Sequence, residues 1–355
     1  MTMTGPADPH QPGLSGSAQP VDVYDLALLD LDGVVYVGPD AVPGAAEAVA
    51  NARAAGLHVA FVTNNASRPP DTVASHLTEL GIQTGPDDVV NSAQAAATLL
   101  SRRLPAGSAV LVVGGEGLYR ALEAVGLRPV ASMDDEPRAV VQGFSPDVGW
   151  RLLAEGTRAV RAGLPWMATN TDLTVPTPYG PAPGNGALVG VIRTATGVTP
   201  EVAGKPQPPL FREAVQRYGS RCPLVVGDRL DTDLEGARNA GLPGLLVLTG
   251  VTGVAELLAA DPGQRPHLLA RDLRGLFEEH PAPEQADGAW RCRDAEVRLD
   301  NGRLDVINTG DNALDLLRAA TAAVWATSDG TAPNEIAQQL AEQLDAMDPS
   351  GPWRR

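Results

Sequence analysis

The chain has 355 residues, 43% of them hydrophobic, which is enough for one large domain or about two to three ordinary domains with a sizeable core. Its formal net charge of −16 argues against nucleic acid and anionic membranes as partners, but a locally positive site could still bind a small anionic substrate. Two cysteines, Cys222 and Cys292, are too few for a disulfide framework, which favours a reducing cytoplasm. No apolar run approaches about 18 residues, so we expect no membrane insertion.

Residues 1–20 are rich in Pro, Gly, Ser and Gln and contain no signal-peptide core. This composition predicts a disordered arm, because such a segment buries too little apolar surface to offset the entropy of ordering it. The pattern of a folded domain begins with the short apolar run from Leu26 to Leu29, which predicts a buried strand.

Two acidic residues, Asp30 and Asp32, follow this first strand, and Gly33 comes directly after them. Residues two apart in an extended chain face the same way, so we expect the two carboxylates to point together. Carboxylates aimed at one point repel each other, and a bound Mg²⁺ would remove that cost. For a lone pair of this kind the alternative is a solvated acidic turn, because turns favour Asp.

The next elements are an Ala-rich helix that ends near residue 55 and a second buried strand over 57–62. This β-α-β order predicts a parallel sheet, whose ligands bind at the carboxyl ends of the strands. Thr63, Asn64 and Asn65 stand at that end of the second strand and offer a hydroxyl and two amides, which suit a phosphate oxygen. A local Asx-turn is the alternative for these residues.

A block of alternating helices and strands follows, and it predicts a domain inserted into the first one. Its long polar loop over 170–186 is of a length that is usually functional inside a compact domain. We predict core segments over 21–90 and 185–280, with the inserted domain over 91–184. The expected elements are helices over 71–80, 92–103, 148–162 and 185–196, and strands over 109–113, 139–142 and 164–168.

Lys205 is the only lysine, and the other 26 basic residues are arginines. Its retention in a Gly-Lys-Pro loop suggests a position that needs a compact ammonium rather than a planar guanidinium. The alternative is chance retention at an exposed site. Shortly afterwards a strand over 224–226 leads into Asp228 and Asp233, so a third strand ends in acids.

From about residue 283 the chain changes character. A Pro- and Glu-rich linker, a hairpin of strands over 290–299 and 304–307, a helix capped by Asp311 and a final helix over 332–345 are expected. This tail over 284–355 contains no reactive constellation, and it predicts a small α+β appendage with a supporting or oligomerisation role. A chain that stops near Pro283 is therefore expected to keep its site.

Four motifs together resemble those of haloacid dehalogenase-superfamily phosphatases that carry a large α/β cap of the C2 type, the NagD-like and 4-nitrophenylphosphatase-like group. The resemblance covers residues 24–280, and Ala168 to Asp172 also matches the exit from the cap. It implies a doubly wound parallel-sheet (Rossmann-like) α/β core with an inserted α/β cap domain and a small C-terminal α+β appendage. The motifs are LLDLDGVVYVG (28–38), VTNNASR (62–68), GKP (204–206) and GDRLDTDLEGA (227–237).

The same resemblance implies a role for each matching residue. Asp30 would be the nucleophile, and Asp32 would be the general acid/base and a Mg²⁺ ligand through its carbonyl. Asp228 would be a further metal ligand, and Asp233 would support the metal site. The residues expected to bind the transferring phosphoryl group are Thr63, Asn64, Asn65 and Lys205, with Lys205 also catalytic.

The expected function is Mg²⁺-dependent hydrolysis of a small phosphate monoester through an aspartyl-phosphate. The acidic, Arg-rich chain and its tail are similar to actinobacterial glycerol 3-phosphate phosphatases, whose tail resembles a partial acetyltransferase fold, so glycerol 3-phosphate is the expected substrate. Pyridoxal phosphate, a nucleotide or a sugar phosphate are alternative substrates. A phosphotransferase and a receiver-like signalling module are alternative functions, and a homo-oligomer is left open.

Overall fold

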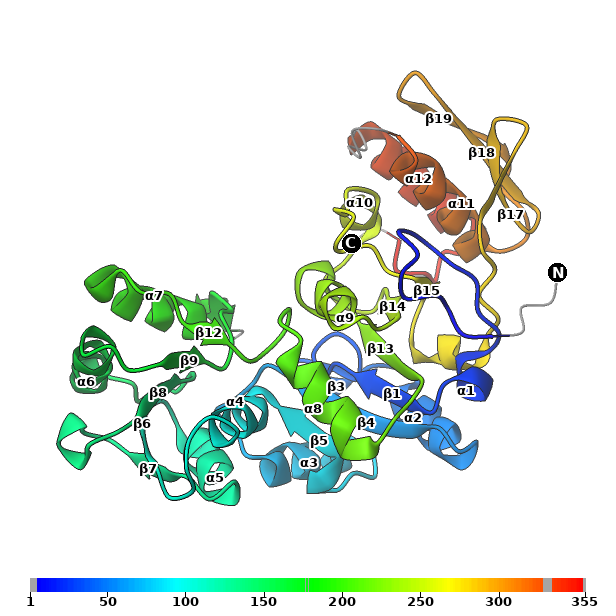
Figure 1. Ribbon diagram of the computed structural model, residues 1–355. Coiled ribbons are helices and arrows are strands. Elements are labelled where there is room, and N and C mark those ends of the chain that lie inside the picture. Colours follow the sequence, from blue (N-terminus) through cyan, green and yellow to red (C-terminus); the bar gives the residue numbers. More distant parts are fainter. Residues whose placement is uncertain (1–4, 176, 178, 328–333, 354–355) are drawn as a thin grey trace. The chain divides into compact units, whose positions relative to one another are not determined.

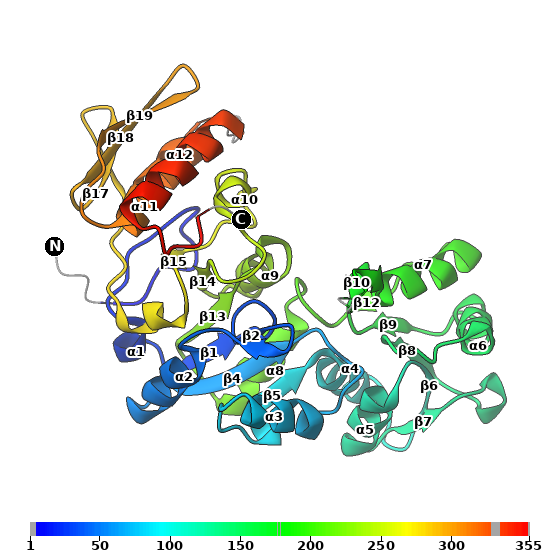
Figure 2. The same ribbon diagram turned by 180° about the vertical axis from the view of Figure 1, so that it is seen from behind.

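The computed structural model describes residues 5–175, 177, 179–327 and 334–353. The chain forms two compact units, which Figures 1 and 2 show from opposite sides. Unit 1 consists of Met1–Ala60 and Tyr218–Arg355, and unit 2 of Phe61–Arg217, so the division falls within strand β4 (His58–Thr63). Among the described residues, no helix combines the length and apolar character needed to cross a membrane.

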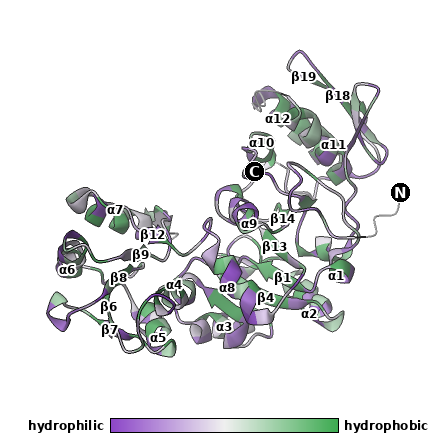
Figure 3. Cartoon of the chain, viewed as in Figure 1, coloured by the Kyte–Doolittle hydropathy of each residue, from purple (hydrophilic) through white to green (hydrophobic). Residues whose placement is uncertain are grey.

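Unit 1 contains parallel strands in the order β15-β14-β13-β1. Their side chains are buried along the whole of each strand, and Figure 3 shows β1 and β13 in the green of hydrophobic residues. Such continuous apolar runs are typical of parallel strands that are covered on both faces. In this register Leu29 of β1 lies beside Val226 of β13, so the two strands end at the same edge of the sheet. The strands are β1 (Leu26–Leu29), β13 (Pro223–Gly227), β14 (Gly244–Val247) and β15 (Leu268–Ala270).

The rest of this part of unit 1 consists of short helices and one small hairpin. Helix α2 follows β1, and the π-helical turn η3 with α9 follows β13. The elements are α1 (Pro20–Val23), β2 (Tyr36–Val37), β3 (Asp40–Ala41), α2 (Ala45–Ala54), η3 (Leu230–Leu234), α9 (Glu235–Ala240), α10 (Val254–Leu258) and the 3₁₀ helix η4 (Leu273–Phe277).

Unit 2 contains the parallel pair β4 and β5 and a five-stranded parallel sheet in the order β12-β9-β8-β6-β7. Helices α6 and α7 pack on this sheet through an apolar cluster that includes Leu111, Val140 and Ile192. The predicted α/β fold with parallel sheets is thereby confirmed. The strands are β5 (Val89–Asn91), β6 (Ala109–Val113), β7 (Arg128–Val130), β8 (Ala139–Gln142), β9 (Trp166–Ala168), β10 (Thr174–Val175), β11 (Ala182–Pro183) and β12 (Glu201–Val202). The helices are α3 (Pro70–Glu79), η1 (Pro86–Asp88), α4 (Ser92–Ser101), α5 (Glu116–Ala124), η2 (Met133–Asp135), α6 (Trp150–Arg161), α7 (Asn185–Thr196) and α8 (Pro209–Tyr218).

The amino-terminal segment is ordered from residue 5, so the predicted disordered arm over 1–20 is wrong for residues 5–20, while residues 1–4 lie outside the described part of the chain. Ser17 and His280 exchange backbone hydrogen bonds of 2.8 and 2.9 Å, and Leu14 is buried in an apolar cluster of unit 1. A segment that is too polar to form its own core can still dock on a core supplied by the rest of the chain. Composition alone does not show whether such a segment docks or stays disordered.

The tail is a four-stranded antiparallel sheet followed by two helices, and it differs from the sequence prediction in three places. The predicted linker contains β16, and the single strand expected over 290–299 is two strands, because Arg293 adopts a positive φ of 50° and starts a turn. The side chain that caps α11 belongs to Asn312 and not to Asp311, and it accepts a bond from the Leu314 N–H. The elements are β16 (Glu284–Ala286), β17 (Ala289–Cys292), β18 (Ala295–Asp300), β19 (Arg303–Asn308), α11 (Ala313–Trp325) and α12 (Asn334–Met347).

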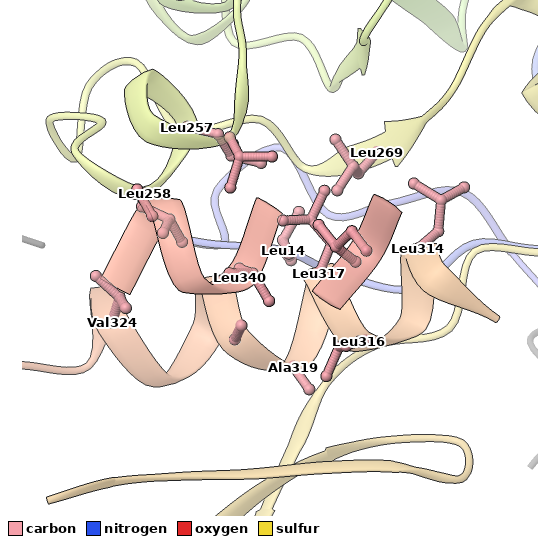
Figure 4. Packing of buried hydrophobic residues seen from close by; sticks show 14 of the residues in the cluster. Leu14, Leu257, Leu258, Leu269, Leu314, Leu316, Leu317, Ala319, Val324 and Leu340 are labelled. Atoms are coloured by element: carbon pink, nitrogen blue, oxygen red, sulfur yellow. The ribbon is translucent and has the colours of Figure 1, made fainter. Parts of the chain in front are cut away.

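The tail shares one apolar cluster with the sheet of unit 1. Figure 4 shows Leu317 and Leu340 of the tail packed among Leu14, Leu257 and Leu269, which come from the amino-terminal segment, α10 and β15. The two parts of the chain are therefore joined by a common core.

A buried ion pair also fastens the tail. Asp315 and Arg318 of α11 lie 2.7 Å apart, and Arg318 donates a 2.6 Å hydrogen bond to the carbonyl of Leu269 in β15. Burial first and the nearby Arg318 second lower the pKa of His280 to about 4, so this histidine is neutral at pH 7. The tail thus supplies charged as well as apolar contacts to β15.

This shared core changes the expectation for a shortened chain. Ending the chain after Pro283 removes the partners of several buried leucines, each of which contributes about 1.5–3 kcal/mol, against a total stability of about 5–15 kcal/mol for a typical protein. We expect the shortened protein to be unfolded or aggregated by circular dichroism and size-exclusion chromatography. Full-length Leu317→Ala is the control, and it should lose about 2–5 kcal/mol but remain folded. A shortened protein that is folded and fully active would restore the original expectation.

Candidate active site

Three carboxylates of unit 1 meet at the carboxyl edge of its sheet. Asp30 directly follows β1 and Asp228 directly follows β13, and the Asp30 N–H donates a 2.9 Å bond to the carbonyl of Val226. Asp30, Asp228 and Asp233 each place one oxygen within 4.8 Å of the others. Asp228 and Asp233 are fully buried, at 0% and 1% exposure, and Asp30 is half-buried. Charges so close and so poorly hydrated repel one another unless a cation offsets them.

Glycines hold the backbone tightly around Asp228. A Cβ atom would lie 2.4 Å from Asp228 Oδ2 if built on Gly33 and 1.9 Å from the same atom if built on Gly250. Gly33 also has a φ of +85°, a conformation that L side chains rarely adopt. The Val251 N–H donates a 2.6 Å hydrogen bond to Asp228 Oδ2, so two loops orient this carboxylate.

Sequence reasoning missed the loop after β14 that supplies Gly250 and Val251. Its signal is the small residues Thr249 and Gly250, which come two and three residues after the end of the apolar strand β14, close to the position that the acids occupy after β1 and β13. Thr249 Oγ1 donates a 2.5 Å bond to the carbonyl of Gly33, which joins this loop to the turn that follows Asp30.

Asp233 reaches the group through the π-helical turn η3, which starts two residues after Asp228. Its Oδ2 accepts a 3.2 Å bond from the Arg229 N–H. Burial lowers the pKa of the Arg229 side chain, but its hydrogen bond to Asp231 and the charges of Asp231, Asp233 and Asp228 outweigh burial and raise that pKa overall. Arg229 therefore stays cationic beside the acidic group.

Asp32 is exposed, and its carboxylate is not a member of the three-carboxylate group. Strand β1 ends at Leu29, so the alternation that predicts a common direction for Asp30 and Asp32 does not extend along both residues. A tight turn replaces it, in which the Gly33 N–H donates a 2.8 Å bond to the carbonyl of Tyr36. A metal contact through the Asp32 carbonyl, which the family resemblance implies, stays a prediction.

The donor set of Asp30, Asp228 and Asp233 fits a hard divalent cation. Carboxylate oxygens are the ligands that Mg²⁺ takes in proteins, and Mg²⁺ keeps several waters besides them. The glycines beside Asp228 leave no space for a side chain next to its carboxylate, so its orientation is set before any ligand arrives. The residues present are therefore compatible with Mg²⁺.

In unit 2, Thr63 ends β4 and is 7% exposed. Thr63 Oγ1 accepts a 3.1 Å bond from the Asn65 N–H. Asn65 is exposed, and its Oδ1 accepts bonds from the N–H of Ser67 at 3.0 Å and from the hydroxyl of Ser67 at 2.7 Å. The Asx-turn alternative therefore describes the local geometry of Asn65, and a role for Asn65 in phosphate binding stays a prediction.

Lys205 is buried, at 3% exposure, so the alternative of chance retention at an exposed site is wrong. Its Nζ donates a 3.2 Å bond to the carbonyl of Val62 in β4. The side chain of Asn64 contacts the main chain of Lys205, because the Lys205 N–H donates a 2.8 Å hydrogen bond to Asn64 Oδ1. The structure thus brings Asn64 and Lys205 together, two residues that are 141 positions apart in the sequence.

Comparison with known proteins agrees with this geometry. A family model described as haloacid dehalogenase-like hydrolase matches residues 27–128, and a second model, HAD-hydrolase-like, matches residues 202–276. The D-glycerol 3-phosphate phosphatase of Mycobacterium tuberculosis is 47% identical over 309 residues, which cover 85% of this chain and 86% of that protein. The chain belongs to the haloacid dehalogenase-like hydrolases.

Solved structures place this hydrolase among phosphatases. A glycerol phosphate phosphatase from Mycobacterium tuberculosis in complex with magnesium matches with a TM-score of 0.83 and 44% identity, over 92% of this chain and 98% of that chain. The p-nitrophenyl phosphatase from Archaeoglobus fulgidus matches with a TM-score of 0.66 and 30% identity, over 72% of this chain and 98% of that chain. The chain is a phosphatase of the same family, and the archaeal relative spans a smaller share of it than the mycobacterial one.

Proposed function

We propose that this hydrolase is a Mg²⁺-dependent phosphatase that hydrolyses glycerol 3-phosphate to glycerol and phosphate. The observation that carries the proposal is the group of three carboxylates formed by Asp30, Asp228 and Asp233. The choice of substrate is supported by the 47% identity to a D-glycerol 3-phosphate phosphatase. The choice of metal is supported by the donor set and by the magnesium complex of the solved relative.

The proposed reaction has two steps on the carboxylates of unit 1. Asp30 attacks phosphorus, so that a bond from its carboxylate oxygen to phosphorus forms while the bond to the leaving alcohol oxygen breaks. Asp32 donates a proton to that oxygen, then takes one from the water that hydrolyses the aspartyl-phosphate. Asp228 and Asp233 would hold Mg²⁺, which offsets the negative charge of the acids and of the phosphoryl oxygens.

The residues of unit 2 are proposed to hold the phosphoryl group. Thr63 would donate through its hydroxyl and Lys205 through its ammonium, and Asn65 is a further predicted contact. Donors that are fixed before the reaction stabilise developing charge without a cost of reorganisation, and positioning is the main contribution in phosphoryl transfer. The burial of Lys205 supports this role, because water competes little for its ammonium.

We also propose a cytoplasmic location, because two cysteines provide no disulfide framework. The acidic net charge of −16 supports a small phosphate ester rather than nucleic acid as the partner. A homo-oligomer stays open, and size-exclusion chromatography with light scattering measures it directly.

The substrate proposal is tested by the release of inorganic phosphate from a panel of esters. The panel contains glycerol 3-phosphate, a hexose phosphate, pyridoxal 5′-phosphate, a nucleoside monophosphate and a phosphopeptide. We expect the highest kcat/KM for glycerol 3-phosphate, and a phosphopeptide should be poor if the polar loop over 170–186 closes on small substrates. A hexose phosphate is the second candidate, because an acid sugar phosphatase of Staphylococcus aureus is 36% identical over 236 residues.

The same assay tests the metal. Activity should be lost after dialysis against EDTA and should return with Mg²⁺, while excess Ca²⁺ should inhibit because its larger and looser shell misplaces the nucleophile. An enzyme that stays active in EDTA would contradict the metal-dependent mechanism. Transfer of phosphate to an added alcohol instead of its release would favour the phosphotransferase alternative, and a higher kcat/KM for another ester would replace glycerol 3-phosphate.

A further inference from the structure

Both ends of the Asn64 carboxamide bind the main chain of Lys205. Asn64 Oδ1 accepts a 2.8 Å bond from the Lys205 N–H, and Asn64 Nδ2 donates a 3.0 Å bond to the Lys205 carbonyl. Asn64 Nδ2 also lies 3.2 and 3.3 Å from the two carboxylate oxygens of Asp172. An amide that satisfies its oxygen and its nitrogen in this way is fixed against rotation, because exchanging the two atoms would break every one of these bonds.

A second layer of asparagine contacts fixes Asn64 itself. Asn170 Nδ2 donates a 2.7 Å bond to the Asn64 carbonyl, and the Ser92 hydroxyl donates a 2.6 Å bond to the same oxygen. Asn185 Nδ2 in turn donates a 2.7 Å bond to the Asn170 carbonyl. Asn170 and Asn185 are buried, so these bonds are protected from competing water.

The loop before Lys205 fits this arrangement closely. A Cβ atom built on Gly204 would lie 2.5 Å from Asn64 Oδ1 and 2.4 Å from the carbonyl oxygen of Thr169. Any side chain at position 204 would therefore displace Asn64 or Thr169, which follows β9. The distance between the loop that carries Lys205 and its neighbours is therefore limited by the main chain of Thr169 and by the side chain of Asn64.

We propose that Asn64 is a positioning residue, which holds the main chain of Lys205 through both ends of its carboxamide while Asp172 orients that carboxamide. This inference rests on the proposed function of Lys205 as a phosphoryl-binding residue. It replaces the expectation that the Asn64 carboxamide itself binds the phosphoryl group, because its oxygen and its nitrogen already bind Lys205. Asn170 and Asp172, which the sequence places only at the exit of the cap, and Asn185 at the start of α7 then support the loop that carries Lys205.

The test is a double-mutant cycle between Asn64 and Lys205. Asn64→Ala, Lys205→Ala and the double variant are compared by kcat, by KM and by the affinity for inorganic phosphate from isothermal titration calorimetry. A displacement of about 1 Å in a catalytic group can cost on the order of 100-fold, so we expect Asn64→Ala to lower kcat/KM by about 10- to 100-fold. If Asn64 acts through Lys205, the double variant should match Lys205→Ala within about twofold in every measured quantity.

Additive losses, in which Asn64→Ala weakens the Lys205→Ala protein as much as it weakens the wild type, would overturn the positioning role. Asp172→Ala is the second variant if Asn64→Ala does not fold, and it should show a smaller loss that also disappears in the Lys205→Ala background. Asn312→Ala is the control for stability, because it removes a helix cap in the tail, worth about 1 kcal/mol, and should leave kcat unchanged.

The two proposals fail in different ways. Near-normal turnover and phosphate affinity in Lys205→Ala would contradict the proposed function of Lys205. An inactive Lys205→Ala protein together with a normal Asn64→Ala protein would leave that function standing and would contradict the positioning role alone.

Discussion

Asp30→Asn is expected to lower kcat by roughly three orders of magnitude or more, as nucleophile knock-outs in other enzymes do. The substitution keeps the shape of the side chain but removes the negative charge that attacks phosphorus. It also removes one of the three carboxylates that lie within 4.8 Å of one another, so it reduces their mutual repulsion. The variant should therefore melt at the same or a higher temperature than the wild type when no metal is present.

The measurement combines kcat with thermal melting in EDTA and in Mg²⁺. Because a ligand that binds only the folded state stabilises it, Mg²⁺ should raise the melting temperature of the wild type more than that of Asp30→Asn. Asp231→Asn is the matched control, since Asp231 belongs to the same acidic motif but is exposed and paired with Arg229 at 2.8 Å. Its kcat should stay within about twofold of the wild type. Substantial turnover of Asp30→Asn in Mg²⁺ would argue against an aspartyl-phosphate.

Lys205→Arg is expected to lower kcat by about a hundredfold or more, although it conserves the charge. The loss of one well-placed donor at a reacting group costs about 3–4 kcal/mol, and the longer guanidinium cannot occupy the position of the ammonium. Lys205 is 3% exposed, so the larger side chain should also destabilise the fold, by about 1–3 kcal/mol for overpacking. The position of Lys205 in a loop before a helix would by itself predict little effect of the substitution on stability. Its burial is the reason for expecting a loss.

The measurement is kcat per folded protein, with circular dichroism and thermal melting recorded for each variant. Lys205→Met removes the charge at similar size and separates the loss of charge from the effect of volume. Arg120→Lys is the control for an exchange between arginine and lysine outside the site, and it should leave kcat unchanged. Arg120 is 51% exposed and pairs with Glu116 and Asp71 at the surface. Near-normal turnover of Lys205→Arg would mean that any cation suffices at this position.

The parts of the fold that could be predicted are those that depend on local patterns. Strands β6 and β8 have the predicted bounds of 109–113 and 139–142, because a run of β-branched apolar residues between turn residues predicts a buried strand strongly. Helix α7 likewise has the predicted bounds of 185–196. Asp30 and Asp228 could be predicted to meet, because carboxyl ends of parallel strands lie at one edge of a sheet.

The docking of whole segments could not be predicted in the same way. Leu14 lies in a segment whose composition is typical of disorder, and Leu317 lies in a tail that has the pattern of a separate appendage, yet both pack in one core with Leu269 of β15. Apolar burial is non-directional, and a sequence pattern shows which face of an element is apolar without showing what covers it.

The sequence by itself therefore determined the family, the parallel α/β architecture and the residue types of the candidate site. Only the tertiary structure decided that Gly250 leaves space for the Asp228 carboxylate and that the carboxamide of Asn64 binds the main chain of Lys205. The physical reason is range. Strand and helix patterns depend on neighbours within a few residues, whereas these contacts join loops that are distant in sequence and depend on distances of a few ångströms between particular atoms.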